Sequence, residues 1–123
     1  MIPQLHVVLR TCDKASLQSN RIFPKNEIVI RCLKSLIATL NNCDHTLHII
    51  DDDSSFKTRE QIKQIATNAT FDFLPATPIN QPVKQKSRYS VSRAYEYIDT
   101  LPEDDLIYIV EAVSYTHLRA HET

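Results

Sequence analysis

The chain has 123 residues, of which 42% are hydrophobic and 24% charged, and its net charge is -1, values typical of one globular domain or part of one. The balanced charge argues against nucleic acid as a partner and gives no reason to expect binding to an anionic membrane. No apolar stretch approaches the ~20 residues of a membrane helix, and the first residues lack the features of a secretory signal. We therefore expect a soluble cytoplasmic protein, which could also act at the cytoplasmic face of a membrane.

Cysteine and glycine usage adds two constraints. The cysteines, Cys12, Cys32 and Cys43, are odd in number and lack C-x-x-C spacing, so we interpret them as free thiols in a reducing compartment. The chain contains no glycine, the residue that normally supplies positive φ and lets a backbone approach a phosphate closely. Its absence excludes a G-x-G-x-x-G dinucleotide loop and a Walker P-loop.

The first half of the chain alternates between strand and helix patterns. A short apolar run at residues 5–9 predicts a buried strand. Apolar side chains recur at helical spacing over residues 26–40 and predict an amphipathic helix. A second predicted strand, residues 46–50, leads directly into Asp51-Asp52-Asp53-Ser54-Ser55.

The same alternation continues after the acidic run. Thr58 and Gln61 fit a capping box and predict the start of a second helix. Residues 71–74 predict a third strand. Residues 75–82 contain three of the chain's six prolines and predict a loop.

The last elements are a helix and a strand. Apolar residues from Val91 to Leu101 follow helical spacing and place Tyr95 on the inner face of a third helix. A turn at Asp104 and Asp105 precedes the fourth predicted strand, residues 106–110. His6 and His48 lie inside predicted strands, and we interpret them as half-buried sheet residues rather than ligands.

This order of elements predicts an α/β fold with a mostly parallel sheet of about four strands and helices on both faces. In such sheets the ligand lies outside the carboxyl ends of the strands. The candidate positions are those that follow each strand: residues 10–13, 51–55, 75–77 and Glu111.

The final residues do not continue this pattern. Residues 113–123 resemble the translation of a sequencing adapter, and Ala112 is interpreted as the junction. We therefore treat residues 112–123 as a non-native tail and give no role to His117 and His121, although His at i and i+4 can bind metal. Residues 1–111 are then an incomplete domain, whose missing later strands would leave an exposed sheet edge and poor solubility.

Three adjacent carboxylates at the end of a strand are the strongest local signal. They repel one another, so a fold keeps them where they meet water, a cation or hydrogen-bond donors. One interpretation is a helix-capping turn, because Asp and Ser favour such positions. The other is a ligand site, in which one carboxylate binds a nucleotide's base or ribose.

Four short segments, taken in order, carry a family resemblance. They are Leu9-Arg10-Thr11-Cys12-Asp13-Lys14, Ile49-Ile50-Asp51-Asp52-Asp53-Ser54-Ser55, Lys84-Gln85-Lys86-Ser87-Arg88-Tyr89 and Ile107-Tyr108-Ile109-Val110-Glu111. Together they resemble the nucleotide-binding half of family-2-type glycosyltransferases with the GT-A fold. The resemblance covers most of residues 5–111 and implies a Rossmann-like GT-A half that binds a nucleotide-sugar.

The resemblance also implies roles for individual residues. Arg10 and Thr11 would lie beside the nucleobase, and Asp52, together with Asp51, would bind the base edge or ribose. Lys86 or Arg88, at the start of the third helix, would approach the diphosphate, where a helix amino terminus suits an anion. Glu111 would begin the motif that holds Mg²⁺ or Mn²⁺.

The activity implied for the intact parent is sugar transfer from a donor such as a UDP-sugar to an unknown glycan, lipid or protein acceptor. The catalytic base would lie downstream, so the chain itself would contain no catalytic residue and would be inactive. Three departures from the family concern specificity: Asp53 replaces the usual glycine, Arg10 replaces a common proline, and the glycine near the third helix is missing.

Two other functions remain as alternatives. A nucleotidyltransferase has a related architecture but usually opens with a glycine- and basic-rich loop, which is absent here. A receiver- or flavodoxin-like signalling module could use the acidic run to bind Mg²⁺. A receiver, however, would place its acidic pair near the first strand, where Arg10-Thr11-Cys12-Asp13 stands.

Overall fold

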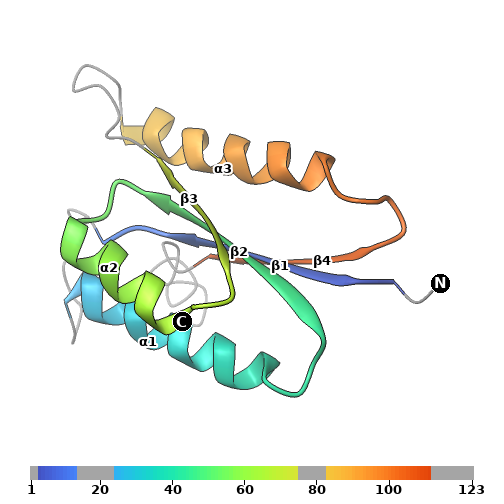
Figure 1. The fold of residues 1–123 in the computed structure, drawn as a ribbon. Helices are drawn as coiled ribbons and strands as arrows, with labels where there is room; N and C mark the ends of the chain where they lie inside the picture. Colours follow the sequence, from blue (N-terminus) through green and yellow to red (C-terminus); the bar gives the residue numbers. More distant parts are fainter. Residues whose placement is uncertain (1–2, 14–23, 75–82, 112–123) are drawn as a thin grey trace, which may run out of the picture.

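The computed structural model describes residues 3–13, 24–74 and 83–111, with the backbone alone for residues 83–89. Four strands alternate with three helices in this part of the chain (Figure 1). The strands are β1 (Leu5–Thr11), β2 (His45–Asp52), β3 (Thr70–Leu74) and β4 (Leu106–Glu111). The helices are α1 (Lys25–Leu40), α2 (Phe56–Ile65) and α3 (Val83–Asp99). The predicted proline loop (75–82) and tail (112–123) lie outside the described residues.

The four strands form one sheet in the order β3-β2-β1-β4, and every neighbouring pair is parallel. This is the Rossmann-like α/β arrangement that the alternating pattern predicted. The chain leaves β1 toward β2 and β3, whereas β4 lies on the opposite side of β1. The order of the strands therefore reverses between β1 and β4.

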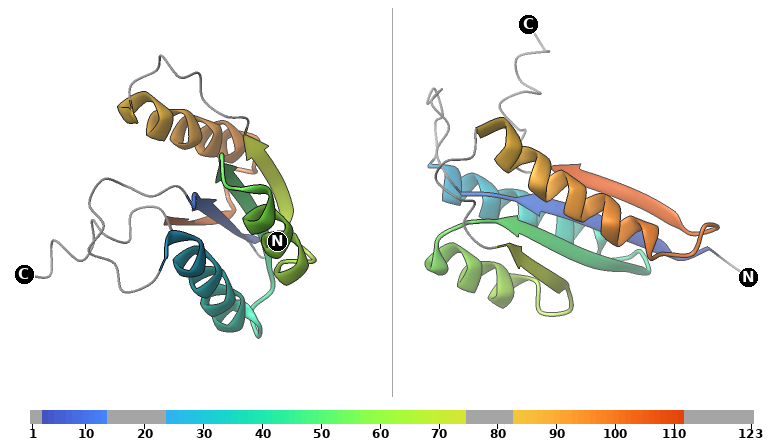
Figure 2. Two further views of the ribbon diagram at one scale, coloured as in Figure 1. Left: turned by 90° about the vertical axis from the view of Figure 1, so that its left-hand side faces the viewer. Right: turned by 90° about the horizontal axis from the view of Figure 1, so that it is seen from above.

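The helices cover both faces of the sheet. Helices α1 and α2 lie together on one face, and α3 lies alone on the other (Figures 1 and 2). Successive residues of a strand point to opposite faces, so β1 serves both layers. Val7 and Leu9 face α1 and α2, whereas Val8 faces α3.

The larger core lies under α1 and α2. Val29, Leu33, Leu36 and Leu40 recur at helical spacing on α1 and are buried against Val7, Leu9, Leu47 and Ile49 of the strands. Burying each such side chain contributes about 1.5–3 kcal/mol. Ile62 and Ala66 extend the same core to α2. The amphipathic helix predicted over residues 26–40 is therefore confirmed.

The smaller core lies under α3 and corrects one prediction. Ala94 packs with Val8, Ile50 and Leu74. Tyr95, predicted to face inward, is 58% exposed. Tyr97 takes that role: its ring stacks on His48 with centroids 3.9 Å apart. The helical spacing found the buried stripe of α3, but it could not tell which of two close tyrosines borders it.

His6 of β1 and His48 of β2 are buried, and the three cysteines form no disulfide. His6 and His48 are buried sheet residues, each 8% exposed and so more buried than predicted. Burial lowers the pKa of His48 below its ordinary value. All three cysteines are free thiols, as predicted, and burial raises the pKa of Cys32.

The predicted start of α2 is wrong. The helix begins at Phe56, and the side chain of Ser55 caps it by accepting a hydrogen bond from the backbone N–H of Thr58. Thr58 therefore lies in the first turn and is not the cap. Its hydroxyl donates to the distant Asp13 carboxylate, 2.6 Å away, a partner that local sequence does not indicate.

A polar cluster joins three strands at the amino edge of the sheet. The His6 ring bonds through Nδ1 to the Thr46 hydroxyl (2.7 Å) and through Nε2 to the Asp105 carboxylate (2.7 Å). Asp105 also accepts the backbone N–H of Gln4. Asp104 and Asp105 thus form the predicted turn before β4. This turn lies at the edge opposite the strands' carboxyl ends.

The Asp105 cluster predicts a pH dependence of stability. Its hydrogen bonds, first from His6 and then from Gln4, hold the pKa of Asp105 below its ordinary value of 3.8. A lowered folded-state pKa stabilises the fold above the unfolded-state value, and this contribution is lost as pH falls through the folded-state pKa. We expect Asp105→Asn to be less stable than wild type at neutral pH, with a difference that shrinks in acid. Urea unfolding from pH 3 to pH 7 measures it. Asp104→Asn, the exposed neighbour, should parallel wild type throughout, and a constant difference for Asp105→Asn would contradict the linkage.

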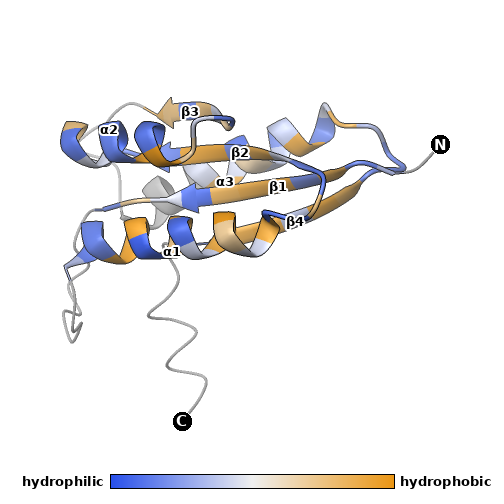
Figure 3. Ribbon diagram, turned by 60° about the horizontal axis from the view of Figure 1, so that its bottom comes forward, coloured by the Kyte–Doolittle hydropathy of each residue, from blue (hydrophilic) through white to orange (hydrophobic). Residues whose placement is uncertain are grey.

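Strand β4 exposes apolar side chains on both faces of the sheet. Leu106, Ile107, Tyr108 and Ile109 are between 37% and 59% exposed. Figure 3 shows this apolar strand at the sheet edge, next to β1. A strand that is apolar on both faces is typical of the interior of a parallel sheet, whereas exposed edges usually carry charges. None of the helices in the described part of the chain is long and apolar enough to cross a membrane.

This exposed edge predicts self-association of the chain. Tyr108→Lys should reduce it, because a charge on an unpaired edge opposes pairing with another strand. Tyr95→Lys is the matched control, because Tyr95 is similarly exposed (58% against 53%) but lies on α3. Sedimentation velocity over a concentration series should show smaller species for Tyr108→Lys alone. Equal effects of both substitutions would mean that charge, and not the β4 edge, controls association.

Candidate functional site

The carboxyl ends of the four strands meet at one edge of the sheet. Ligands of open α/β sheets bind outside this edge, where the strand order reverses. In this chain the reversal lies between β1 and β4. The candidate site therefore consists of the residues that end the strands, together with the loop after β2 and the helices α2 and α3.

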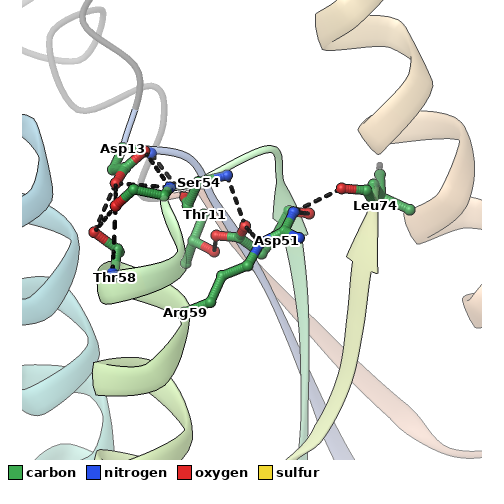
Figure 4. Close-up of polar contacts among 8 residues, drawn as sticks. Thr11, Asp13, Asp51, Ser54, Thr58, Arg59 and Leu74 are labelled. Atoms are coloured by element: carbon green, nitrogen blue, oxygen red, sulfur yellow. Dashed lines mark hydrogen bonds and ion pairs between the residues drawn. The ribbon is translucent and has the colours of Figure 1, made fainter. Parts of the chain in front are cut away.

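Asp51 is the buried centre of this edge (Figure 4). Its side chain is fully buried, yet it accepts hydrogen bonds from the Thr11 hydroxyl (2.7 Å), the Ser54 backbone N–H (3.0 Å) and Arg59 Nε (2.7 Å). A buried carboxylate without such donors would be strongly unfavourable. Thr11 and Asp51, both predicted to touch the nucleotide, thus bind each other, and Asp51 organises the edge from inside.

Asp13 connects the end of β1 to the start of α2 through hydrogen bonds. Its carboxylate accepts bonds from the Ser55 backbone N–H (3.1 Å), the Ser55 hydroxyl (2.7 Å) and the Thr58 hydroxyl (2.6 Å). Its own N–H donates to the Ser54 hydroxyl. A negative charge at a helix amino terminus is stabilising because it meets unpaired N–H groups and the positive end of the helix dipole. This position is thus occupied by the protein's own carboxylate.

Arg59 joins β3 to the same network. One Nη donates to the Leu74 carbonyl (2.6 Å), while Nε holds Asp51, and the guanidinium lies over the Phe73 ring at 5.1 Å. Sequence reasoning gave no role to Asp13 beyond its place in the first motif and none to Arg59. The Ser-x-x-Thr spacing before α2 could have pointed to a capped helix, but nothing local indicates that Arg59 reaches two strand ends.

Asp53 turns the chain between β2 and α2. It has φ 59°, the single positive φ in the described residues. This is the position where the resembled family usually has glycine. Asp tolerates the left-handed region better than most residues, because its short side chain can bond locally. Asp53 therefore takes a conformation that favours glycine in a chain that contains none.

The turn at Asp53 gives a direct test. We expect Asp53→Val to destabilise the fold by about 1–2 kcal/mol, because a β-branched residue is strained at positive φ. Asp53→Gly should lie within about 1 kcal/mol of wild type, since relief of strain is offset by the greater entropy of the unfolded chain. Urea unfolding midpoints compare the two. If Asp53→Val matched Asp53→Gly, the left-handed conformation would not be required.

Arg10 and Glu111 meet across the point where the strand order reverses. They are register partners on β1 and β4, and Arg10 Nη1 donates to the Glu111 carboxylate. Arg10 is 4% exposed and also donates from Nε and Nη2 to the hydroxyl of Ser90 on α3, at 3.2 and 2.8 Å. The predicted base-binding residue and the predicted metal ligand thus form an ion pair.

The other predicted site residues are placed less completely. Asp52 is half-buried at the end of β2 and lies on the α3 face, in register with Leu74. Lys86 and Arg88 belong to the amino-terminal half of α3, as predicted, but their side chains are outside the described part.

A divalent metal was expected at Glu111. Among residues 3–13, 24–74 and 83–111, no three His, Cys, Asp or Glu side chains are grouped so that they could hold a metal ion. Glu111 also lies against a guanidinium, which repels a cation. The described residues by themselves do not fit a metal site, and metal binding stays a prediction.

Comparison of the chain with protein-family models, with curated proteins and with solved structures found no match.

Proposed function

We propose that the chain is the nucleotide-sugar-binding part of a glycosyltransferase, whose parent transfers a sugar from a nucleoside diphosphate donor to an acceptor. The observation that carries the proposal is the reversal of strand order between β1 and β4, with polar side chains ending both strands. Such a reversal is where open parallel sheets bind nucleotides. Three of the four resembling segments contain the carboxyl end of a strand, and the remaining one lies in the amino-terminal half of α3.

The contacts at the edge indicate different roles for Asp51, for Asp52 and for the cations of α3. Asp51 accepts hydrogen bonds from Thr11, Ser54 and Arg59, so its role is to hold the strand ends in place. Asp52 is next to Asp51 and half-buried. We assign to it the role of accepting hydrogen bonds from a base or ribose. Lys86 and Arg88 belong to the amino-terminal half of α3. Cationic residues at a helix amino terminus suit a diphosphate.

The strand order weighs against one alternative. Flavodoxin- and receiver-like sheets have the order 2-1-3-4-5, in which the first strand lies between the second and the third. Here β1 lies between β2 and β4, and β3 is at the edge. A nucleotidyltransferase is not separated from a glycosyltransferase by strand order, because both would bind a nucleotide at this edge.

The proposal predicts nucleotide-sugar binding that depends on Asp52. We expect UDP-sugars, GDP-sugars or ADP-sugars, titrated with Mg²⁺, to shift amide signals at the ends of β1 and β2 in protein NMR spectra. Asp52→Asn should weaken binding about tenfold, the loss of one good charge-assisted hydrogen bond. Asp44→Asn is the control, because Asp44 is exposed before the opposite end of β2. Absence of binding by all three sugar nucleotides at millimolar concentration, or equal weakening by both substitutions, would reject the proposal.

A further inference from the structure

The ion pair between Arg10 and Glu111 is unequal in burial. The Arg10 side chain is 5% exposed, whereas that of Glu111 is 39% exposed. A buried guanidinium that loses its counter-ion is strongly unfavourable. A half-exposed carboxylate is already partly hydrated, so it loses less on leaving its partner than a buried carboxylate would. The buried cation therefore requires an anion, but that anion need not be Glu111.

Arg10 is also held in one orientation. Its Nε and Nη2 both donate to the hydroxyl of Ser90, which is 1% exposed on α3. Nη1 is thereby aimed across the β1–β4 boundary toward Glu111. A planar guanidinium with a fixed edge is well suited to the oxygens of a phosphate group.

We propose that Arg10 is an anion-binding residue at this boundary, and that Glu111 is an exchangeable counter-ion that a diphosphate group displaces. The identity of the diphosphate as part of a nucleotide-sugar rests on the proposed function; the exchange itself does not. Displacement would also free Glu111 at the position where the resemblance places the start of a metal motif. Arg10, predicted to lie beside the nucleobase, would then contact the phosphates.

The exchange predicts that one substitution strengthens anion binding instead of weakening it. Inorganic pyrophosphate is titrated into the whole chain by calorimetry, without divalent metal and with EDTA present. Glu111→Gln should bind pyrophosphate about threefold to tenfold more tightly than wild type, because the competing carboxylate is gone. If Glu111 acted only as a metal ligand, or only as a structural partner of Arg10, this substitution would not improve metal-free binding.

Glu103→Gln is the matched control. Glu103 is exposed in the turn before β4, at the opposite edge of the sheet, and its substitution makes the same change in net charge. Its pyrophosphate affinity should equal that of wild type. Ser90→Ala, which frees the Arg10 side chain, should weaken binding in the Glu111→Gln background. Thermal unfolding of each variant checks that it is folded.

The outcomes separate this inference from the proposed function. Tighter binding by Glu111→Gln with Glu103→Gln unchanged supports the exchange, even if no nucleotide-sugar binds. Unchanged or weaker binding by Glu111→Gln overturns it, even if a nucleotide-sugar binds in a manner that depends on Asp52. Equal tightening by Glu111→Gln and Glu103→Gln, or absence of pyrophosphate binding in wild type and Glu111→Gln alike, also overturns it.

Discussion

The buried carboxylate of Asp51 is the group on which the carboxyl edge of this sheet depends. An ionised carboxylate in a protein interior needs hydrogen-bond donors, and these come from β1, from the loop after β2 and from α2. Arg59 then continues from Asp51 to the end of β3. The Asp51 carboxylate therefore holds three strand ends and a helix in fixed positions.

The acidic run Asp51–Asp53, at the carboxyl end of β2, serves several purposes. Asp51 points inward to its donors, Asp53 takes the left-handed conformation that turns the chain, and Asp52 lies half-buried on the α3 face. A second carboxylate, Asp13, comes from the other loop and binds the first turn of α2. The helix-capping interpretation describes part of this region, because the turn before α2 is polar and Ser55 caps the helix, and ligand binding by the run stays a prediction.

The boundary between β1 and β4 differs from the boundary between β1 and β2. On the β2 side, buried apolar side chains and the Asp51 network join the strands. On the β4 side, the carboxyl end carries the Arg10–Glu111 pair, and much of the strand is exposed on both faces. The Glu111 carboxylate is exchangeable because it is partly exposed. The Arg10 guanidinium requires an anion because it is buried.

Local sequence was sufficient for the element types, their order and the parallel sheet, because hydrophobic periodicity depends only on which face of each helix or strand is buried. It also placed the polar residues that follow the strands at one edge. It placed the inward tyrosine of α3 wrongly, since the position of Tyr97 depends on its distant partner His48. It also placed the start of α2 at Thr58, whereas the cap is Ser55, three residues earlier. The pairing of Thr11 with Asp51 and of Arg10 with Glu111 is set by register across strands 40 and 101 residues apart. Only the tertiary structure could decide which charges are buried and satisfied and which remain near solvent, because burial is a property of the packed layers and not of the neighbouring residues.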